Sequence, residues 1–97
     1  MTLFAVTPTR GEAWARGRVL EQQVGWRPHA DFMDALAAEG FVILGGPLEG
    51  TDDVLLIVRA QGADQVRARL AADPWEAQHL LRTITVLPWT LRLGKLV

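Results

Sequence analysis

The chain has 97 residues, of which 49% are hydrophobic and 22% charged, and its formal net charge is −1. This length fits one domain spanning residues 1–97. The charges are scattered singly, without the basic stripe that nucleic-acid binding requires. The longest wholly apolar run, Val54–Val58, is far too short to cross a membrane. We therefore expect neither nucleic acid nor a membrane as a partner. The apolar N-terminus lacks the basic segment of a signal peptide, so the expected location is cytoplasmic.

Four residue types with chemical importance are absent, because the 97 residues contain no Ser, Cys, Tyr or Asn. Serine and cysteine nucleophiles, a tyrosine acid, disulfides and thiolate metal sites are thereby excluded from this sequence. The two histidines, His29 and His79, lie fifty positions apart and form no metal signature. We expect no metal and no cofactor, which leaves acid–base chemistry as the main option.

In the first half of the chain, Leu3–Thr7 is predicted to be a strand that ends at Pro8. Residues 9–27 contain three glycines and are expected to form a broken helix or a loop. A helix is predicted from Pro28 to Glu39, because proline suits a first helical turn and Gly40 suits a left-handed stop. One face of this helix carries His29, Phe32, Met33, Leu36 and Ala37.

The second half supplies three more strands and one more helix. Phe41–Leu44 is predicted as a strand closed by a Gly45-Gly46-Pro47 turn, Asp53–Ala60 as a strand, and Ala63–Ala72 as a helix. A short turn follows from Asp73, and Leu81–Trp89 forms the last strand, which the tail to Val97 could extend. The order β-α-β-β-α-β predicts an α+β, ferredoxin-like antiparallel sheet with its helices on one face.

The strand pattern also bears on assembly. Val54–Val58 does not alternate between apolar and polar residues, so both of its faces are expected to be buried. Two helices can cover only one face of a four-stranded sheet. A second copy of the chain is the simplest cover for the other face, and a homodimer is therefore expected. The alternative is a monomer in which residues 9–27 fold across that face.

His29 and Asp73 are the leading candidates for catalysis. His29 follows Pro28 in the first helical turn and should point inward, where a neutral ring can act as a base. A core-edge histidine bonded to the backbone is the alternative. Asp73 and Glu76 have the spacing of a capping box. Asp73 could instead orient His29 as a carboxylate partner, and its two oxygens allow both roles.

Five further residues are candidates for ligand binding. Arg27 could anchor an anionic substrate beside His29, and His79 could line the same cleft. The alternative for each is a solvated surface side chain. The remaining three would let the backbone approach a ligand or would wall a pocket, although each also suits a turn or a core position: Gly46, Pro47 and Trp75.

A series of short motifs runs in a consistent order from Leu3 to about Trp89 and resembles the YCII-related family. The motifs are Arg27-Pro28-His29, Glu39-Gly40, Gly46-Pro47, Asp73-Pro74-Trp75 and Pro88-Trp89. The resemblance implies a ferredoxin-like fold that dimerises into an α/β barrel. It also implies a His–Asp pair, at His29 and Asp73, in a cleft near the dimer interface.

The resemblance further implies a reaction class, because its characterised members include a dehydrochlorinase of a chlorinated hydroxyquinol. Related dimeric barrels include isomerases that abstract protons without a cofactor. His79 stands where the family usually has a glycine, and its ring could narrow the cleft or add a second acid–base group. We expect a lyase or isomerase that acts on a small cyclic or carbonyl-containing metabolite. The alternatives are a non-catalytic small-molecule binding or accessory dimer and a purely structural dimer.

Overall fold

The computed structural model describes residues 1–95 and contains the predicted order of strands and helices. A short 3-10 helix, η1, and a one-turn helix, α3, are added to that order. The elements are β1 (Thr2–Arg10), η1 (Leu20–Gln22), α1 (Trp26–Ala38), β2 (Val42–Pro47), β3 (Val54–Ala60), α2 (Ala63–Leu70), α3 (Pro74–Ala77) and β4 (Leu81–Pro88).

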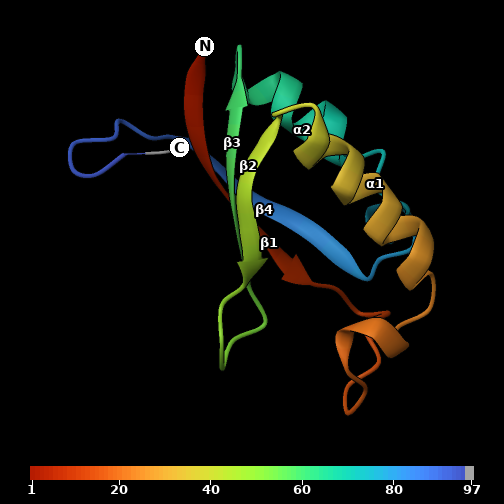
Figure 1. Cartoon of the computed structure of the whole chain (residues 1–97). Coiled ribbons are helices and arrows are strands. Elements are labelled where there is room, and N and C mark those ends of the chain that lie inside the picture. Colours follow the sequence, from red (N-terminus) through yellow and green to blue (C-terminus); the bar gives the residue numbers. More distant parts are fainter. Residues whose placement is uncertain (96–97) are drawn as a thin grey trace.

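The four strands form one antiparallel sheet in the order β2-β3-β1-β4. Helices α1 and α2 both lie on one face of this sheet (Figure 1). The predicted α+β, ferredoxin-like architecture is therefore confirmed. In this topology β1 and β3 are the central strands, and α1 and α2 each follow one of them.

The main core lies between the sheet and the two helices. Alternate residues of β1 point to this face, and Phe4 and Val6 pair with Val58 and Leu56 of β3. The helices contribute apolar side chains from their inner faces. The buried cluster comprises Phe4, Val6, Leu36, Phe41, Val42, Leu56, Val58, Ala60, Val66, Leu70 and Val86. Phe32 and Met33 pack against it as predicted, whereas Ala37 is exposed.

Several element boundaries differ from the sequence prediction. Strand β1 does not end at Pro8 but runs to Arg10, with a register shift against β4 between Thr7 and Pro8 that accommodates the proline. Helix α1 begins at Trp26, two residues before Pro28, because Gly25 takes a left-handed conformation (φ +75°) at the N-cap. The Gly45-Gly46-Pro47 segment was predicted as a turn but belongs to β2. Gly45 packs tightly there, since a Cβ atom at this position would lie 2.6 Å from Leu56 Cδ2. The β2–β3 turn comes later, where the Leu48 amide donates to the Asp53 carbonyl over 2.9 Å.

Residues 11–25 form an irregular segment that leads into α1 and does not cover the open face of the sheet. Figure 1 shows this segment on the helix side, below the start of α1. Trp14 packs there in a second buried cluster with Trp75, Leu80 and Leu81. Buried Gln23 holds the segment together through hydrogen bonds with the Ala15 amide and carbonyl, both 2.8 Å. The alternative placement of this segment across the open face is therefore wrong.

The opposite face of the sheet carries a row of apolar side chains. Leu44, Ile57, Ala5 and Leu87 stand side by side across the four strands. Ile57 is only 6% exposed, but Leu44, Leu55 and Leu87 are 56%, 37% and 59% exposed. Within one chain, the predicted burial of both faces of Val54–Val58 thus holds for Ile57 and fails for Leu55.

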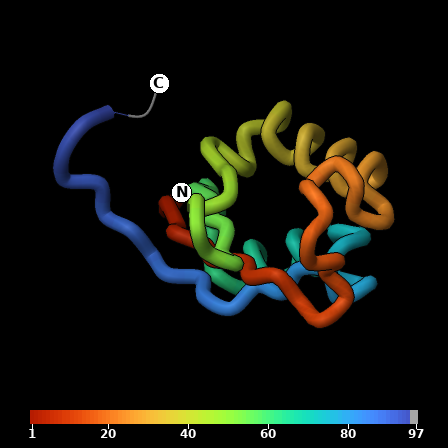
Figure 2. Tube along the Cα trace, turned by 90° about the horizontal axis from the view of Figure 1, so that it is seen from below, coloured from red at the N-terminus to blue at the C-terminus, as the bar shows by residue number. Residues whose placement is uncertain are grey.

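The C-terminal tail leaves the sheet on the side away from the helices (Figure 1), and the view from below shows it departing from the rest of the fold (Figure 2). Residues 89–95 form no strand, so the last strand does not extend into the described part of the tail. The final positions, 96–97, lie outside the described residues. No helix among residues 1–95 has the length and apolar character needed to span a membrane.

Candidate active site

His29 and Asp73 meet in the structure, although 44 positions separate them in sequence. His29 lies in the first turn of α1, and Asp73 lies in the connection between α2 and α3. The His29 Nδ1 atom is 2.9 Å from Asp73 Oδ1 and 2.8 Å from Asp73 Oδ2. The two residues are only 9% and 3% exposed. The fold therefore forms a buried histidine–carboxylate pair at the N-terminal end of α1.

Asp73 also caps α3, so one side chain makes both of the contacts considered from the sequence. Its Oδ1 atom accepts a hydrogen bond from the Trp75 amide over 2.9 Å. The predicted capping box is nevertheless incomplete. Glu76 does not reach back to the Asp73 amide, which donates to the Leu70 carbonyl over 3.0 Å. Glu76 instead accepts from the Thr83 hydroxyl over 2.6 Å, because β4 brings that residue alongside α3.

The contact with Asp73 determines which nitrogen of a neutral His29 carries the proton. An ionised carboxylate can only accept hydrogen bonds, so Nδ1 must donate and Nε2 keeps its lone pair. Nε2 makes no hydrogen bond to any of the described residues. Within residues 1–95, no fully enclosed side-chain nitrogen or oxygen atom lacks a partner, so Nε2 must keep some contact with solvent. The lone pair of His29 is therefore not used by another described residue.

Aromatic rings surround the other sides of His29. The Trp75 ring stacks on the imidazole with a centroid separation of 3.8 Å and an interplanar angle of 7°. Trp26 lies at the side, with its ring centroid 6.1 Å from that of His29. Trp14 meets Trp75 edge-on at 5.4 Å. From the sequence, Trp75 suited a core position or the wall of a pocket, and nothing in the spacing of Trp26 and Trp75 shows that both lie against one histidine.

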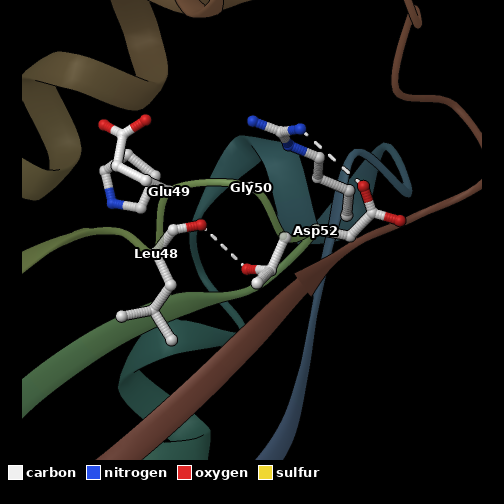
Figure 3. Close-up of a pocket in the computed structure, with 7 residues that line it drawn as sticks. Leu48, Glu49, Gly50 and Asp52 are labelled. Atoms are coloured by element: carbon white, nitrogen blue, oxygen red, sulfur yellow. Dashed lines mark hydrogen bonds and ion pairs between the residues drawn. The ribbon is translucent and has the colours of Figure 1, made fainter.

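The remaining predicted site residues lie in three different places. Arg27 is exposed and pairs with Asp31 one turn along α1, at 3.4 Å, rather than with a group near His29. Pro47 lines a surface hollow formed by Arg10 and the β2–β3 turn, and Gly46 precedes it in β2 (Figure 3). His79 lines a second hollow with Arg10, Glu76 and other residues. Neither of these two hollows is lined by His29 or Asp73.

His79 occupies a backbone position that favours glycine. It follows the C-cap of α3 with φ +64°, in the left-handed region. The Leu80 amide donates to the Trp75 carbonyl and the His79 amide to the Glu76 carbonyl, which is the paired bonding of a Schellman motif. A histidine therefore stands at the position where such motifs usually place glycine, at a cost of about 1 kcal/mol.

Arg10 lines both hollows, and sequence reasoning did not single it out. Its amide donates to the Asp52 carbonyl over 2.9 Å, and its guanidinium lies 4.5 Å from the Trp14 ring centroid. Its Nη1 atom is 3.7 Å from the Asp52 carboxylate. No motif marks Arg10, because its place depends on strand pairing and on a turn more than forty positions away.

Asp52 joins the segment 11–25 to the β2–β3 turn. Its carboxylate accepts two hydrogen bonds from the Arg16 guanidinium, at 3.0 and 3.1 Å. These bonds hold the pKa of Asp52 below its usual range, and the charges of Arg16 and then of Arg10 lower it further. Among residues 1–95, no three histidine, cysteine, aspartate or glutamate side chains are grouped to hold a metal ion.

No protein-family model matches the chain, and no curated protein is detectably similar to it in sequence. A solved structure does resemble it: 5-chloro-2-hydroxyhydroquinone dehydrochlorinase (TftG) from Burkholderia phenoliruptrix AC1100, in complex with 2,5-dihydroxybenzoquinone. The TM-score is 0.61, and the match covers 95% of each chain at 19% sequence identity. The two chains share a fold. At this identity, the likeness to TftG extends to the fold alone.

Proposed function

We propose that the protein is an acid–base enzyme of lyase or isomerase type, formed by a single YCII-like domain. In this proposal, His29 Nε2 takes a proton from a small cyclic or carbonyl-containing metabolite. The observation that carries the proposal is the buried Nδ1–Asp73 contact, which leaves the lone pair of His29 unused by another described residue. A general base needs such an available pair and a second group that orients its ring.

The chemistry requires only these two side chains. Nε2 removes a proton from a ring hydroxyl or from a carbon next to a carbonyl, and the electrons of the broken bond form a phenolate or an enolate. Asp73 stabilises the resulting imidazolium without itself accepting the proton. In an elimination, a leaving group such as chloride departs with its bonding electrons and the proton passes to solvent. In an isomerisation, His29 returns the proton to another carbon. Neither reaction needs a cofactor.

The similar structure, that of TftG, supports this reaction class and ligand type. Dehydrochlorination removes HCl, and 2,5-dihydroxybenzoquinone is a small cyclic compound with carbonyl groups. A chain of the same fold therefore acts on a molecule of the class proposed for this protein. Arg27 is proposed to contact the ligand after releasing Asp31. Gly46, Pro47 and His79 stay proposed ligand contacts, but within one chain Pro47 and His79 line two hollows that His29 does not reach.

We also propose that the protein is a cytoplasmic homodimer, with the open face of the sheet at the interface. Leu44, Leu55 and Leu87 expose large apolar surfaces there, and Ile57 and Ala5 lie between Leu44 and Leu87. A second copy would bury these side chains. Scattered surface leucines are common, but a row across all four strands is a patch that favours association.

The second candidate is a non-catalytic domain that binds small molecules. One observation favours it: the two surface hollows lined by Arg10 lie apart from the dyad. In that case His29 and Asp73 would serve only to join α1 to α3. Both candidates predict ligand binding, and only the first predicts turnover that depends on His29.

The test compares the wild type with His29→Ala, using release of chloride from 5-chloro-2-hydroxyhydroquinone and binding of 2,5-dihydroxybenzoquinone. Removal of a general base should lower turnover by about 10²–10⁴-fold. The Asp34→Ala variant, at an exposed position of α1 with no proposed contact to the ligand, controls for general damage to the helix. Equal chloride release by wild type and His29→Ala would contradict the catalytic role. Binding without turnover in both proteins would favour the binding domain.

A further inference from the structure

Trp75 was a candidate for walling a ligand pocket, but its side chain is fully buried. It is 0% exposed and is among the most enclosed large side chains of the protein. Within this chain, a ligand cannot reach the indole without displacing its neighbours. The contact that the indole does make is with the imidazole of His29, at 3.8 Å and nearly parallel. The role of Trp75 must therefore be sought in what it does to His29.

The indole itself is held firmly from several sides. Its Nε1 atom donates to the Val24 carbonyl over 2.7 Å, and its backbone amide donates to Asp73 Oδ1 over 2.9 Å. Trp14 and Trp26 pack against the ring at centroid distances of 5.4 and 5.9 Å. A ring with these restraints provides a rigid surface for its neighbour, because movement would break a hydrogen bond and leave buried polar groups unpaired.

Asp73 alone restrains His29 incompletely. The carboxylate restrains Nδ1, but a hydrogen bond is soft, and small rotations about χ1 and χ2 can still move the ring. Nε2 lies on the far side of the imidazole from Cβ, so a rotation about χ1 displaces it strongly. A parallel aromatic surface in contact with the ring opposes this motion, since offset or parallel stacking holds two planes together.

We propose that Trp75 is a positioning residue that fixes the plane of the His29 imidazole, so that Nε2 keeps one direction toward the substrate. The inference rests on the proposed function of His29. It assigns two different tasks to neighbouring residues: Asp73 sets the tautomer, and Trp75 sets the orientation. Through Val24, the orientation of the ring also depends on the segment 11–25 being closed onto α3.

NMR of protein labelled with ¹⁵N-histidine measures this directly, through exchange of the His29 Nδ1 proton with water. Trp75→Leu removes the flat surface and should raise the exchange rate roughly 2- to 12-fold, the value of one aromatic pair. Trp75→Phe keeps a stacking ring and should stay within about twofold of the wild type. Trp89→Leu makes the same substitution at a tryptophan exposed at the end of β4, and it should change nothing. Chloride release in Trp75→Leu should show a fall in kcat with KM nearly unchanged, because Trp75 touches no ligand.

Unchanged Nδ1 proton exchange in a folded Trp75→Leu protein would overturn the proposal. If that variant does not fold, Trp75→Met, which has a long side chain without a flat ring, takes its place and is held to the same criterion. The result is separable from the proposed function. Faster exchange in Trp75→Leu, together with turnover that does not depend on His29, would contradict the acid–base role of His29 and leave the positioning role of Trp75 standing. Unchanged exchange in Trp75→Leu, together with turnover that depends on His29, would contradict the positioning role of Trp75 and leave the acid–base role of His29 standing.

Discussion

The two faces of the sheet differ in how completely a single chain buries their apolar side chains. On the helix face, side chains are enclosed, and the buried polar pair His29–Asp73 is hydrogen-bonded. On the other face, Leu44, Leu55 and Leu87 remain between 37% and 59% exposed. The chemical groups of the candidate site are thus assembled within a single chain, whereas the burial of its sheet is not. The site and the interface are therefore open to separate tests.

The largest expected effect is on the helix face and concerns the two contacts of Asp73. Asparagine caps a helix about as well as aspartate, so Asp73→Asn should retain thermal stability. It lacks the charge that stabilises an imidazolium and can force the wrong tautomer on His29, so turnover should fall by about 10⁴-fold. Asp73→Ala should lose turnover and, through the lost cap, also about 0.5–2 kcal/mol of stability. Thermal melts and chloride release measure the two outcomes. Wild-type turnover in Asp73→Asn would reduce the residue to a cap.

The next effect concerns the open face. The wild type should have twice the 10.7 kDa mass of one chain when measured by light scattering at micromolar concentration. Leu55→Glu places a charge on β3, on the same open face and two positions from Ile57 of the apolar row, and should shift the mass to that of a monomer. Ala68→Glu, on the exposed side of α2, is the matched control and should remain dimeric. A monomeric wild type would remove the open face from the account of assembly.

A smaller effect is expected from His79, on the helix side. His79→Gly relieves the left-handed strain at the end of α3 and should stabilise the fold by about 1 kcal/mol. For a domain of this size that corresponds to a rise in Tm of roughly 4–8 °C. If the imidazole also contacts the ligand, binding of 2,5-dihydroxybenzoquinone should weaken in the same variant. A lower Tm for His79→Gly would show that the ring makes stabilising contacts that outweigh the strain.

The smallest effect on stability is expected from the exposed ion pair of Arg16 and Asp52, in which Arg16 holds the pKa of Asp52 low. A carboxylate with a lowered folded-state pKa adds stability above its unfolded pKa and loses it as pH falls through the folded value. Tm should therefore decline in acid more steeply for the wild type than for Asp52→Asn. Added salt should shrink the difference, because the pair is exposed. Parallel Tm–pH curves for the two proteins would contradict this account of the ion pair.

Most of the fold was predicted from hydrophobic periodicity and from the positions of glycine and proline. The α1 stripe of Phe32, Met33 and Leu36 reflects the helical period, and Val54–Val58 reflects a central strand. These signals are local, and they are strong wherever burial forces a repeating pattern. The prediction of a turn at Gly45-Gly46-Pro47 was wrong, because glycines also permit close packing inside a strand, as Gly45 does against Leu56. Local sequence cannot distinguish those two uses of glycine.

In the candidate site, too, some features had a local signal in the sequence and others did not. Composition alone made acid–base chemistry the main option, since serine, cysteine and tyrosine are absent. Asp73 was identifiable as a cap from its immediate neighbours, and Asp73 as the partner of His29 followed from a resemblance rather than from local spacing. The stacking of Trp75 on His29, the pairing of Glu76 with Thr83 and the place of Arg10 between two hollows had no local signal. Each joins residues from different elements, and only the packing of α1, α3 and the sheet sets such distances.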